Sequence, residues 1–413
     1  MKPAVETAAR GAASTTPAIA HRSASAPASP IRRLIPHADA AKARGTHVYF
    51  LNIGQPDIET PPEMMDVLKD IGIKVVPYGP SMGLTEYRKA LIGYYRRAVG
   101  IELDIEDIMV TIAGSEAITF AMAVITDPGD EVLIPEPMYA NYLGFAAMLG
   151  IKVVPITCRP EDGYHLPKRE AIEKLITPRT KAILYCNPGN PSGVIFDRAE
   201  LDLLADLART RGLFLIADEV YREIVFDGEA ISALTYTDLL DRIIMVDSIS
   251  KRYSACGARI GAFVTKNREV MAAALRYAQA RLCPPTIEQM MAIRAVDLPA
   301  SYFARIVEEY RGRRDTVYDA MSSWPGVVCR KPGGAFYQMA RLPVDDAEKF
   351  IIWLLDDFSV DGATTMLAPA EGFYATPGTG RDEVRVACVL NRQDLARAMS
   401  IVEKGLAAYP GRR

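Results

Sequence analysis

The sequence predicts an α/β protein, in which a mostly parallel sheet has helices on both faces and is joined to a smaller α+β domain. Between residues 107 and 250, short uninterrupted apolar runs alternate with helical segments. Such runs are typical of strands that are buried on both faces of a parallel sheet. From about residue 306 the pattern changes to a long charged helix, a strand-like segment and a closing helix, which indicates a second unit.

The elements follow from local signals, taken in chain order. Gly150 and Gly212 each come directly after a predicted helix and are expected to end it. Strands are predicted at residues 107–113, 130–137, 151–157, 180–186, 213–220, 241–250 and 383–390, and helices at 114–126, 139–150, 197–212 and 301–324.

These patterns divide the chain into three parts. Residues 1–30 are mostly Ala, Ser, Thr and Pro with one acidic residue, which predicts a disordered N-terminal extension. An organelle transit peptide has a similar composition and is the alternative for this segment. Residues 31–60 and 306–413 are expected to form the small domain, and residues 61–305 the large domain.

Composition excludes several classes of function. A formal net charge of -3 argues against nucleic acid or an anionic membrane as the partner. No apolar run approaches the roughly 18 residues that a membrane helix needs. The six cysteines contain no C-x-x-C pair and the four histidines do not cluster, so we expect no metal site. This cysteine pattern fits a reducing compartment, and we predict a cytoplasmic protein.

Ligands on parallel sheets bind beyond the carboxyl ends of the strands. The loops of interest therefore follow Ala113, Tyr185, Ala217 and Val246, and each of them carries an unusual set of polar residues.

Two of these loops suit a phosphate group. Gly114 and Ser115 lie where a strand turns into a helix, so backbone N–H groups there are free and the helix dipole favours an anion. Ser248 adds a hydroxyl group, and Arg259 adds a guanidinium group that can bind phosphate through two hydrogen bonds.

The other polar residues suit an aromatic ring that carries an aldehyde. Asp218 ends an apolar strand, where a buried carboxylate needs a cationic partner. Tyr221 and Asn190 offer a phenol and an amide to a ring oxygen, and Lys251 offers an amine to an aldehyde. Together with a phosphate site, these groups describe pyridoxal 5'-phosphate.

The chain resembles fold-type I pyridoxal-phosphate enzymes of the class I/II aminotransferase family, the relatives of aspartate aminotransferase. The resemblance extends from about residue 45 to the C-terminus, and "SISKRYSACGARIG", "NPGNPSG" and "ADEVY" are its most specific motifs. It implies catalytic roles for Lys251, the Schiff-base lysine, and for Asp218 and Tyr221. The implied cofactor-binding residues are Gly114, Ser115, Tyr139, Asn190, Asp218, Tyr221, Ser248, Lys251, Arg259 and Tyr78.

The resemblance also implies the substrates and the assembly. Gly54, Asn190 and Arg385 match residues that bind the substrate, and Arg385 would bind the α-carboxylate. Tyr78 matches a tyrosine that reaches the phosphate in the neighbouring subunit, which implies a homodimer. The implied reaction moves an amino group from an L-amino acid to a 2-oxo acid by a ping-pong mechanism, with Lys251 as the proton carrier.

The residues do not identify the amino donor. Some aspartate-specific relatives have a lysine after the glycine of the phosphate turn, whereas this chain has Ser115 there. Others have an arginine upstream of a Pro-Pro pair, but Arg281 lies too close to the pair to align with it. A neutral or aromatic donor is therefore at least as plausible as a dicarboxylic one.

Three other functions remain open at this point. The same fold and cofactor also support elimination, decarboxylation or oxidation of an amino acid. Residues 248–251 fit the S-x-x-K motif of some serine hydrolases, although the companion S-D-N and K-T-G triplets are absent. A catalytically inactive binding module is the third alternative, but every cofactor position is filled.

Overall fold

The computed structural model describes residues 19–24 and 26–413. Residues 1–18, most of the predicted extension, lie outside this range. In the described part of that segment, a short helix α1 spans His21–Ala24 and Pro30 is buried. None of the helices in the described residues is long and apolar enough to cross a membrane.

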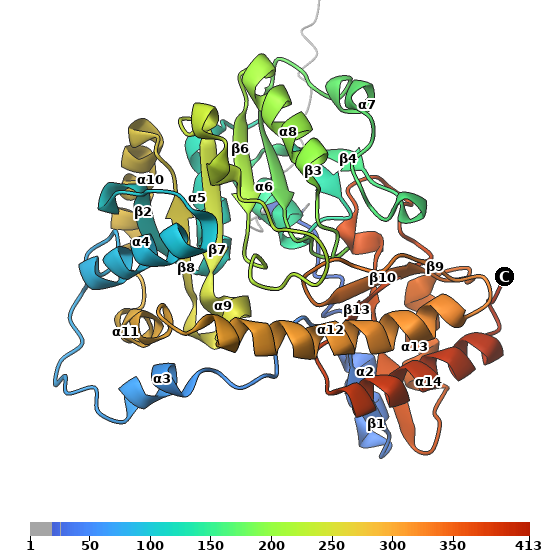
Figure 1. The fold of residues 1–413 in the computed structure, drawn as a ribbon. Helices are drawn as coiled ribbons and strands as arrows, with labels where there is room; N and C mark the ends of the chain where they lie inside the picture. The colour runs from blue at the N-terminus through green and yellow to red at the C-terminus, as the bar shows by residue number, and fades with distance from the viewer. Residues whose placement is uncertain (1–18, 25) are drawn as a thin grey trace, which may run out of the picture.

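A seven-stranded sheet forms the centre of the larger part of the molecule (Figure 1). All neighbouring strands run parallel except where β8 pairs with β2 and β7. The fold class predicted from the sequence is confirmed. The strand order is β2 (Ile108–Ile112), β8 (Ile260–Val264), β7 (Ile243–Ser248), β6 (Phe214–Asp218), β5 (Thr180–Cys186), β3 (Glu131–Glu136) and β4 (Lys152–Thr157).

Alternate residues of the strands face two separate apolar clusters, which lie on the two faces of the sheet. For example, Ile183 and Leu215 belong to one cluster, whereas their neighbours Leu184 and Ile216 belong to the other. On the first face the strands pack with α4 (Thr85–Val99) and α8 (Arg198–Arg211), and on the second with α5 (Ala113–Ile125), α6 (Asn141–Leu149) and α10 (Arg268–Arg281).

The predicted strands and helices of the large sheet form close to their expected bounds. Gly150 and Gly212 end α6 and α8 in the left-handed conformation, with φ angles of 72° and 68°. The antiparallel strand β8 was not predicted. It passes very close to its neighbours at Gly261, where a Cβ atom would lie 2.5 Å from the carbonyl carbon of Ala113. This position therefore requires glycine.

The C-terminal residues form two further sheets. A four-stranded antiparallel sheet has the order β12-β13-β10-β9, and β1 pairs in parallel with β11. The long helix α12 runs from beneath the large sheet to these smaller sheets (Figure 1). These elements are β1 (His47–Phe50), β9 (Val328–Cys329), β10 (Tyr337–Arg341), β11 (Ala363–Met366), β12 (Ala368–Pro369), β13 (Glu383–Ala387), α2 (Ile35–Ala43), α12 (Ala300–Ser323), α13 (Ala347–Asp356) and α14 (Arg392–Ala408).

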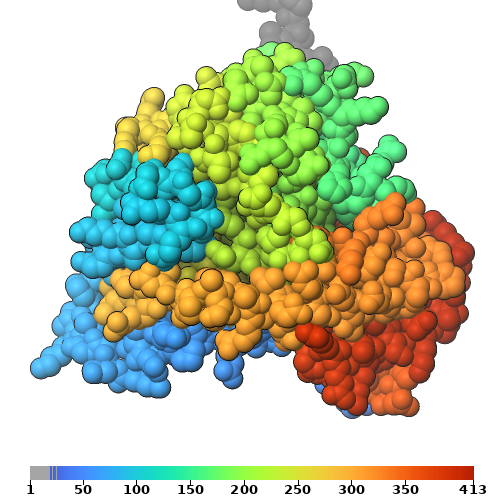
Figure 2. Space-filling view, viewed as in Figure 1, coloured from blue at the N-terminus to red at the C-terminus, as the bar shows by residue number. Residues whose placement is uncertain are grey.

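The remaining helices lie at the edges and connections of the large sheet. They are α3 (Pro62–Met65), α7 (Arg169–Glu173), α9 (Ile249–Arg252) and α11 (Thr286–Ala295). The space-filling view shows that the segment around α3 forms an outlying edge of the molecule (Figure 2).

Candidate active site

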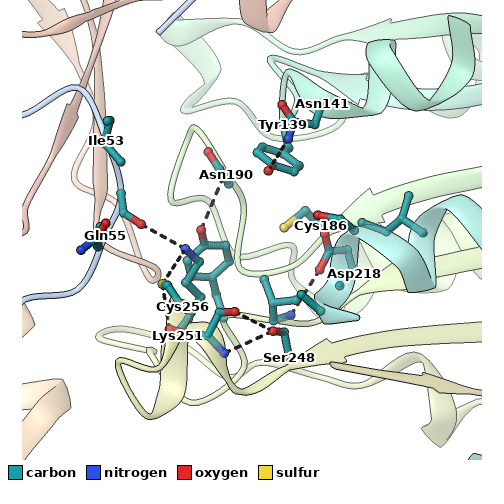
Figure 3. A pocket seen from close by; sticks show the side chains of 18 of the residues that line it. Ile53, Gln55, Tyr139, Asn141, Cys186, Asn190, Asp218, Ser248, Lys251 and Cys256 are labelled. Carbon is teal, nitrogen blue, oxygen red and sulfur yellow. Dashed lines mark hydrogen bonds between the residues drawn. The ribbon is translucent and has the colours of Figure 1, made fainter. Parts of the chain in front are cut away.

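A pocket of about 270 Å³ lies at the carboxyl ends of the strands of the large sheet, as expected for a parallel sheet. Ile53 and Gln55 lie on one side and Tyr139 and Asp218 on the other, with Lys251 between them (Figure 3). Every residue predicted for the site lines this pocket except Tyr78: Gly54, Gly114, Ser115, Tyr139, Asn190, Asp218, Tyr221, Ser248, Lys251, Arg259 and Arg385.

Lys251 lies on the short helix α9, directly after the buried strand β7. Ser248 caps this helix, because its side chain accepts a hydrogen bond from the backbone N–H of Ser250. The Nζ atom of Lys251 donates to the carbonyl oxygen of Gly54 at 3.0 Å and lies 3.7 Å from the sulfur of Cys256. The backbone carbonyl group of Gly54 thus holds the amine of Lys251 in the pocket.

The predicted phosphate-binding residues come from two neighbouring turns. Gly114 and Ser115 lie in the first turn of α5, where backbone N–H groups have no partner within the helix. The hydroxyl group of Ser248 donates to the carbonyl oxygen of Ile260 at 3.0 Å. Arg259 has a φ angle of 55°, and its guanidinium group donates to the carbonyl oxygen of Cys256 at 2.8 Å. The N–H groups at the start of α5 and the positive charge of Arg259 lie at these turns, and this arrangement suits a phosphate.

Asp218 ends β6 and is 4% exposed. Tyr142 donates a hydrogen bond to Oδ2 at 2.6 Å, and the backbone N–H of Val220 donates to Oδ1 at 3.3 Å. No cationic side chain of the described residues forms an ion pair with this carboxylate. Burial raises the pKa of Asp218 to about 6, although both hydrogen bonds favour the ionised form. The site therefore suits a ligand that brings a positive charge.

Arg385 extends from β13 into the same pocket and is only 2% exposed. Its guanidinium group donates to Oδ1 of Asn190 at 3.1 Å and to the backbone carbonyl oxygen of Asn52 at 2.6 Å. Its Nε atom has no hydrogen-bond partner, and no carboxylate of the described residues pairs with it. Burial removes water from this cation and lowers the pKa of Arg385. A ligand carboxylate would supply the missing partner.

Tyrosine side chains lie around the guanidinium group of Arg385. The hydroxyl groups of Tyr221 and Tyr337 lie 2.9 Å apart, and Asn190 contacts the Tyr221 hydroxyl group at 3.5 Å. The ring of Tyr337 also lies 4.5 Å from the guanidinium carbon of Arg385. At Gly54 any Cβ atom would collide with the Tyr337 ring, so a larger residue there would displace this tyrosine.

Tyr139 and Tyr78 differ in their surroundings. Tyr139 lines the pocket, its hydroxyl group accepts a hydrogen bond from Asn141 at 2.7 Å, and burial raises its pKa to about 12. A neutral phenol ring of this kind suits a contact with another ring. Tyr78 is 80% exposed and lies outside the pocket of its own chain.

Several residues of the site were missed by the sequence analysis. Tyr142 and Tyr337 contact predicted residues, Asn52 holds Arg385 through a backbone oxygen, and Cys256 lies beside Lys251. Tyr142 lies within a predicted helix, three residues after Tyr139, which was the only signal for it. Nothing in the local sequence of Asn52 indicated that its carbonyl oxygen has this role.

The residues fit pyridoxal phosphate and an amino acid. The carboxylate of Asp218 and the guanidinium group of Arg385 are both buried without a partner of opposite charge in the described residues. The cationic ring nitrogen of the cofactor would offset the first charge, and a substrate carboxylate the second. The amine of Lys251 lies in the same pocket, where it could bind an aldehyde.

Comparison with known proteins identifies the family. The model of the family described as "Aminotransferase class I and II" matches residues 46–402. The chain belongs to this family. An arginine–pyruvate transaminase of Pseudomonas aeruginosa is 31% identical over 84% of this chain and 89% of its own length. An aspartate aminotransferase of Rhizobium meliloti is 32% identical over 77% of this chain and 78% of its own length.

Solved structures agree with this assignment. An alanine aminotransferase of Pyrococcus furiosus has a TM-score of 0.85 at 31% identity, over 94% of this chain and 99% of that one. A single mutant of the aspartate aminotransferase of Thermus thermophilus has a TM-score of 0.87 at 26% identity, over 95% of this chain and 100% of that one. The aminotransferase is thus a pyridoxal-phosphate enzyme of the aspartate aminotransferase type, as the sequence predicted, and not a serine hydrolase.

The pKa of Asp218 leads to a prediction for the protein without cofactor. Because burial raises this pKa from 3.8 to about 6, the folded state binds more protons than the unfolded state between these values, and stability falls as the pH rises through this range. At a pH above both values, this rise in pKa lowers the free energy of unfolding by on the order of 3 kcal/mol. Asp218→Asn removes this cost, so at pH 7 the variant should melt at a higher temperature than the wild type without cofactor.

With cofactor bound the order should reverse, because the variant lacks the anion that the ring nitrogen needs. Thermal melts at pH 4.5 and pH 7, with and without pyridoxal phosphate, measure both effects. An Asp218→Asn variant that retains cofactor as well as the wild type would contradict the assignment of Asp218.

Proposed function

We propose that this pocket transfers the amino group of an L-amino acid to a 2-oxo acid by a ping-pong mechanism, with Lys251 as the proton carrier. One arrangement of side chains in the pocket supports these roles. The amine of Lys251 shares a small pocket with a buried carboxylate and a buried guanidinium group that lack ionic partners in the described residues. Such a pocket favours a ligand pair with one cationic ring and one carboxylate.

The cofactor would be held by side chains from several turns of the large sheet. The first turn of α5 would bind the phosphate together with Ser248 and Arg259, since all of these groups donate hydrogen bonds. Asp218 would hold the proton of the ring nitrogen, and Tyr139 would lie against the ring. The complete set proposed is Gly114, Ser115, Tyr139, Asn190, Asp218, Tyr221, Ser248, Lys251 and Arg259, with Tyr78 from a second subunit.

When bound, the cofactor supplies an aldehyde for the substrate amine and a cationic ring that accepts electrons from the α-carbon. Asp218 must be ionised for this purpose. The hydrogen bonds from Tyr142 and from the backbone N–H of Val220 favour that form, and a cation opposite the carboxylate favours it further.

Arg385 would bind the substrate carboxylate and so set the direction of the α-hydrogen. Its buried Nε atom has no hydrogen-bond partner, Asn190 accepts a hydrogen bond from its guanidinium group at 3.1 Å, and Gly54 lines the same pocket. Orientation of this kind can lower the activation free energy by several kcal/mol, on the order of 7 kcal/mol in the best cases. Lys251, whose Nζ atom lies 3.0 Å from the carbonyl oxygen of Gly54, would then remove the α-proton.

The second step of a ping-pong reaction uses the same groups in reverse. The 2-oxo acid would bind to Arg385 in place of the first product, and Lys251 would return the proton to the new α-carbon. One pocket therefore binds both substrates in turn, so both must carry the α-carboxylate that Arg385 recognises.

Exposed apolar residues support a homodimer. Val75 is 74% exposed, Val76 57% and Tyr78 80%, and all three lie in the segment between α3 and α4. Apolar patches of this kind mark interaction sites. A second copy of the chain would cover this segment and receive Tyr78 at its phosphate site.

The domain division and the location are also proposals. Residues 31–60 and 306–413 would form the small domain, and residues 61–305 the large one. The pairing of β1 with β11 supports this division, because it joins the two segments of the small domain. The six cysteines are unpaired, which supports a reducing compartment such as the cytoplasm.

Lys251→Ala tests the proposed function. The variant should still bind pyridoxal phosphate, since the phosphate and ring contacts remain, but its rate of amino transfer should fall by about 10²- to 10⁴-fold or more. The rate of 2-oxo acid formation in a single turnover measures this, and a small primary amine in the buffer should restore part of it. Lys349→Ala, at an exposed position, is the control. Near-normal turnover in Lys251→Ala would show that another group is the base.

Mixed dimers test the role of Tyr78. A Lys251→Ala subunit and a Tyr78→Ala subunit should each give weak enzymes. If Tyr78 acts across the dimer, the mixed dimer contains one site with both groups intact, so activity should reappear on mixing after brief unfolding and refolding. If Tyr78 acts within its own chain, no intact site forms and mixing should have no effect.

A further inference from the structure

The pocket contains one cation more than the proposed reaction uses. Among the described residues that line it, Asp218 is the single carboxylate, whereas Arg32, Lys251, Arg259 and Arg385 are basic. Lys251 serves the aldehyde, Arg259 the phosphate and Arg385 the α-carboxylate. Arg32 has no assigned partner.

The surroundings of Arg32 fix its backbone beside the α-carboxylate site. The side chain of Asn52 donates to the carbonyl oxygen of Ile31 at 3.4 Å, and the carbonyl oxygen of Asn52 accepts from Arg385 at 2.6 Å. Asn52 thus connects the residue before Arg32 to Arg385. On the other side, Pro30 packs directly against Gly372.

The side chain of Arg32 is exposed, and none of the described residues forms an ion pair with it. Its neighbour Arg33 differs, because it forms an ion pair with Glu348. Arg33 is also absent from the pocket lining. Of these two adjacent arginines, one is therefore used within the fold and the other is available at the pocket.

Other candidate cations for a second anionic group are occupied or absent. Arg281 donates to Glu116 at 3.1 Å and to the backbone oxygens of Ser81 and Val110, so its charge is already paired. Ser115 provides no charge at the position where some relatives have lysine.

We propose that Arg32 binds the distal carboxylate of a dicarboxylic substrate, either an amino acid or a 2-oxo acid with a carboxylate at the end of its side chain. This proposal rests on the proposed function, because it assumes that Arg385 binds the α-carboxylate. Two guanidinium groups then bind the two ends of one substrate. The half-buried Ile31 and the exposed Ile53 line the pocket beside them and suit the methylene groups between the two carboxylates.

In a ping-pong reaction this subsite need serve only one of the two substrates. A dicarboxylic acceptor such as 2-oxoglutarate can use Arg32, while a neutral amino donor leaves the exposed side chain in solvent. Selection of the acceptor and tolerance of the donor are therefore compatible in one pocket.

Binding of unreactive acids to the enzyme with cofactor tests the subsite without turnover. Glutarate carries two carboxylates, and valerate has the same number of carbons but only one. Titration calorimetry should show tighter binding of glutarate by the wild type. In Arg32→Gln the Kd for glutarate should rise about tenfold, the range of a charge-assisted hydrogen bond at an exposed site, and that for valerate should not change. Arg33→Gln is the matched control and should leave both values unchanged.

The kinetic counterpart compares 2-oxoglutarate with pyruvate as acceptor. In Arg32→Gln, kcat/KM should fall for 2-oxoglutarate and not for pyruvate. Suppose that the enzyme transaminates normally but Arg32→Gln leaves the ratio of the Kd values for glutarate and valerate unchanged. The assignment of Arg32 to the subsite is then wrong, and the proposed function stands. If the wild type binds neither acid and transfers no amino group, the proposed function fails, and the subsite fails with it.

Discussion

The site depends on two charges of opposite sign that are buried without ionic partners in the described residues. Asp218 is 4% exposed and Arg385 2%. Desolvation acts against both, as the raised pKa of the carboxylate and the lowered pKa of the guanidinium group show. The fold tolerates this cost because neutral groups donate hydrogen bonds to Asp218 and accept them from Arg385. What is missing in each case is a counter-charge, and the family's cofactor and substrate carry both.

Holding these charges requires both parts of the molecule. The large sheet provides Asp218 at the end of β6 and Lys251 just beyond β7, whereas Arg385 comes from the antiparallel sheet of the C-terminal part. Backbone carbonyl groups of the N-terminal segment join them, through Gly54 to Lys251 and through Asn52 to Arg385. A displacement of either part would thus change the distance between the amine of Lys251 and the guanidinium group of Arg385, on which the proposed proton transfer depends.

The sequence predicted those parts of the site that local patterns determine. Asp218 and Lys251 follow apolar strands within recognisable motifs, so their positions at the sheet edge could be inferred from the chain alone. The antiparallel strand β8 was missed, since its run is short and follows an irregular loop. Arg32 was missed as well, because its proximity to the pocket arises from a contact between Asn52 and Ile31 that no local pattern encodes.

Reduction with borohydride identifies the amine that holds the cofactor, because it converts a cofactor bound to an amine into a permanent adduct. The purified enzyme with pyridoxal phosphate would be reduced, digested and mapped by mass spectrometry. We expect a pyridoxyl adduct on Lys251 and on no other lysine. An adduct confined to a different lysine, or no adduct in a preparation that retains stoichiometric cofactor, would contradict it.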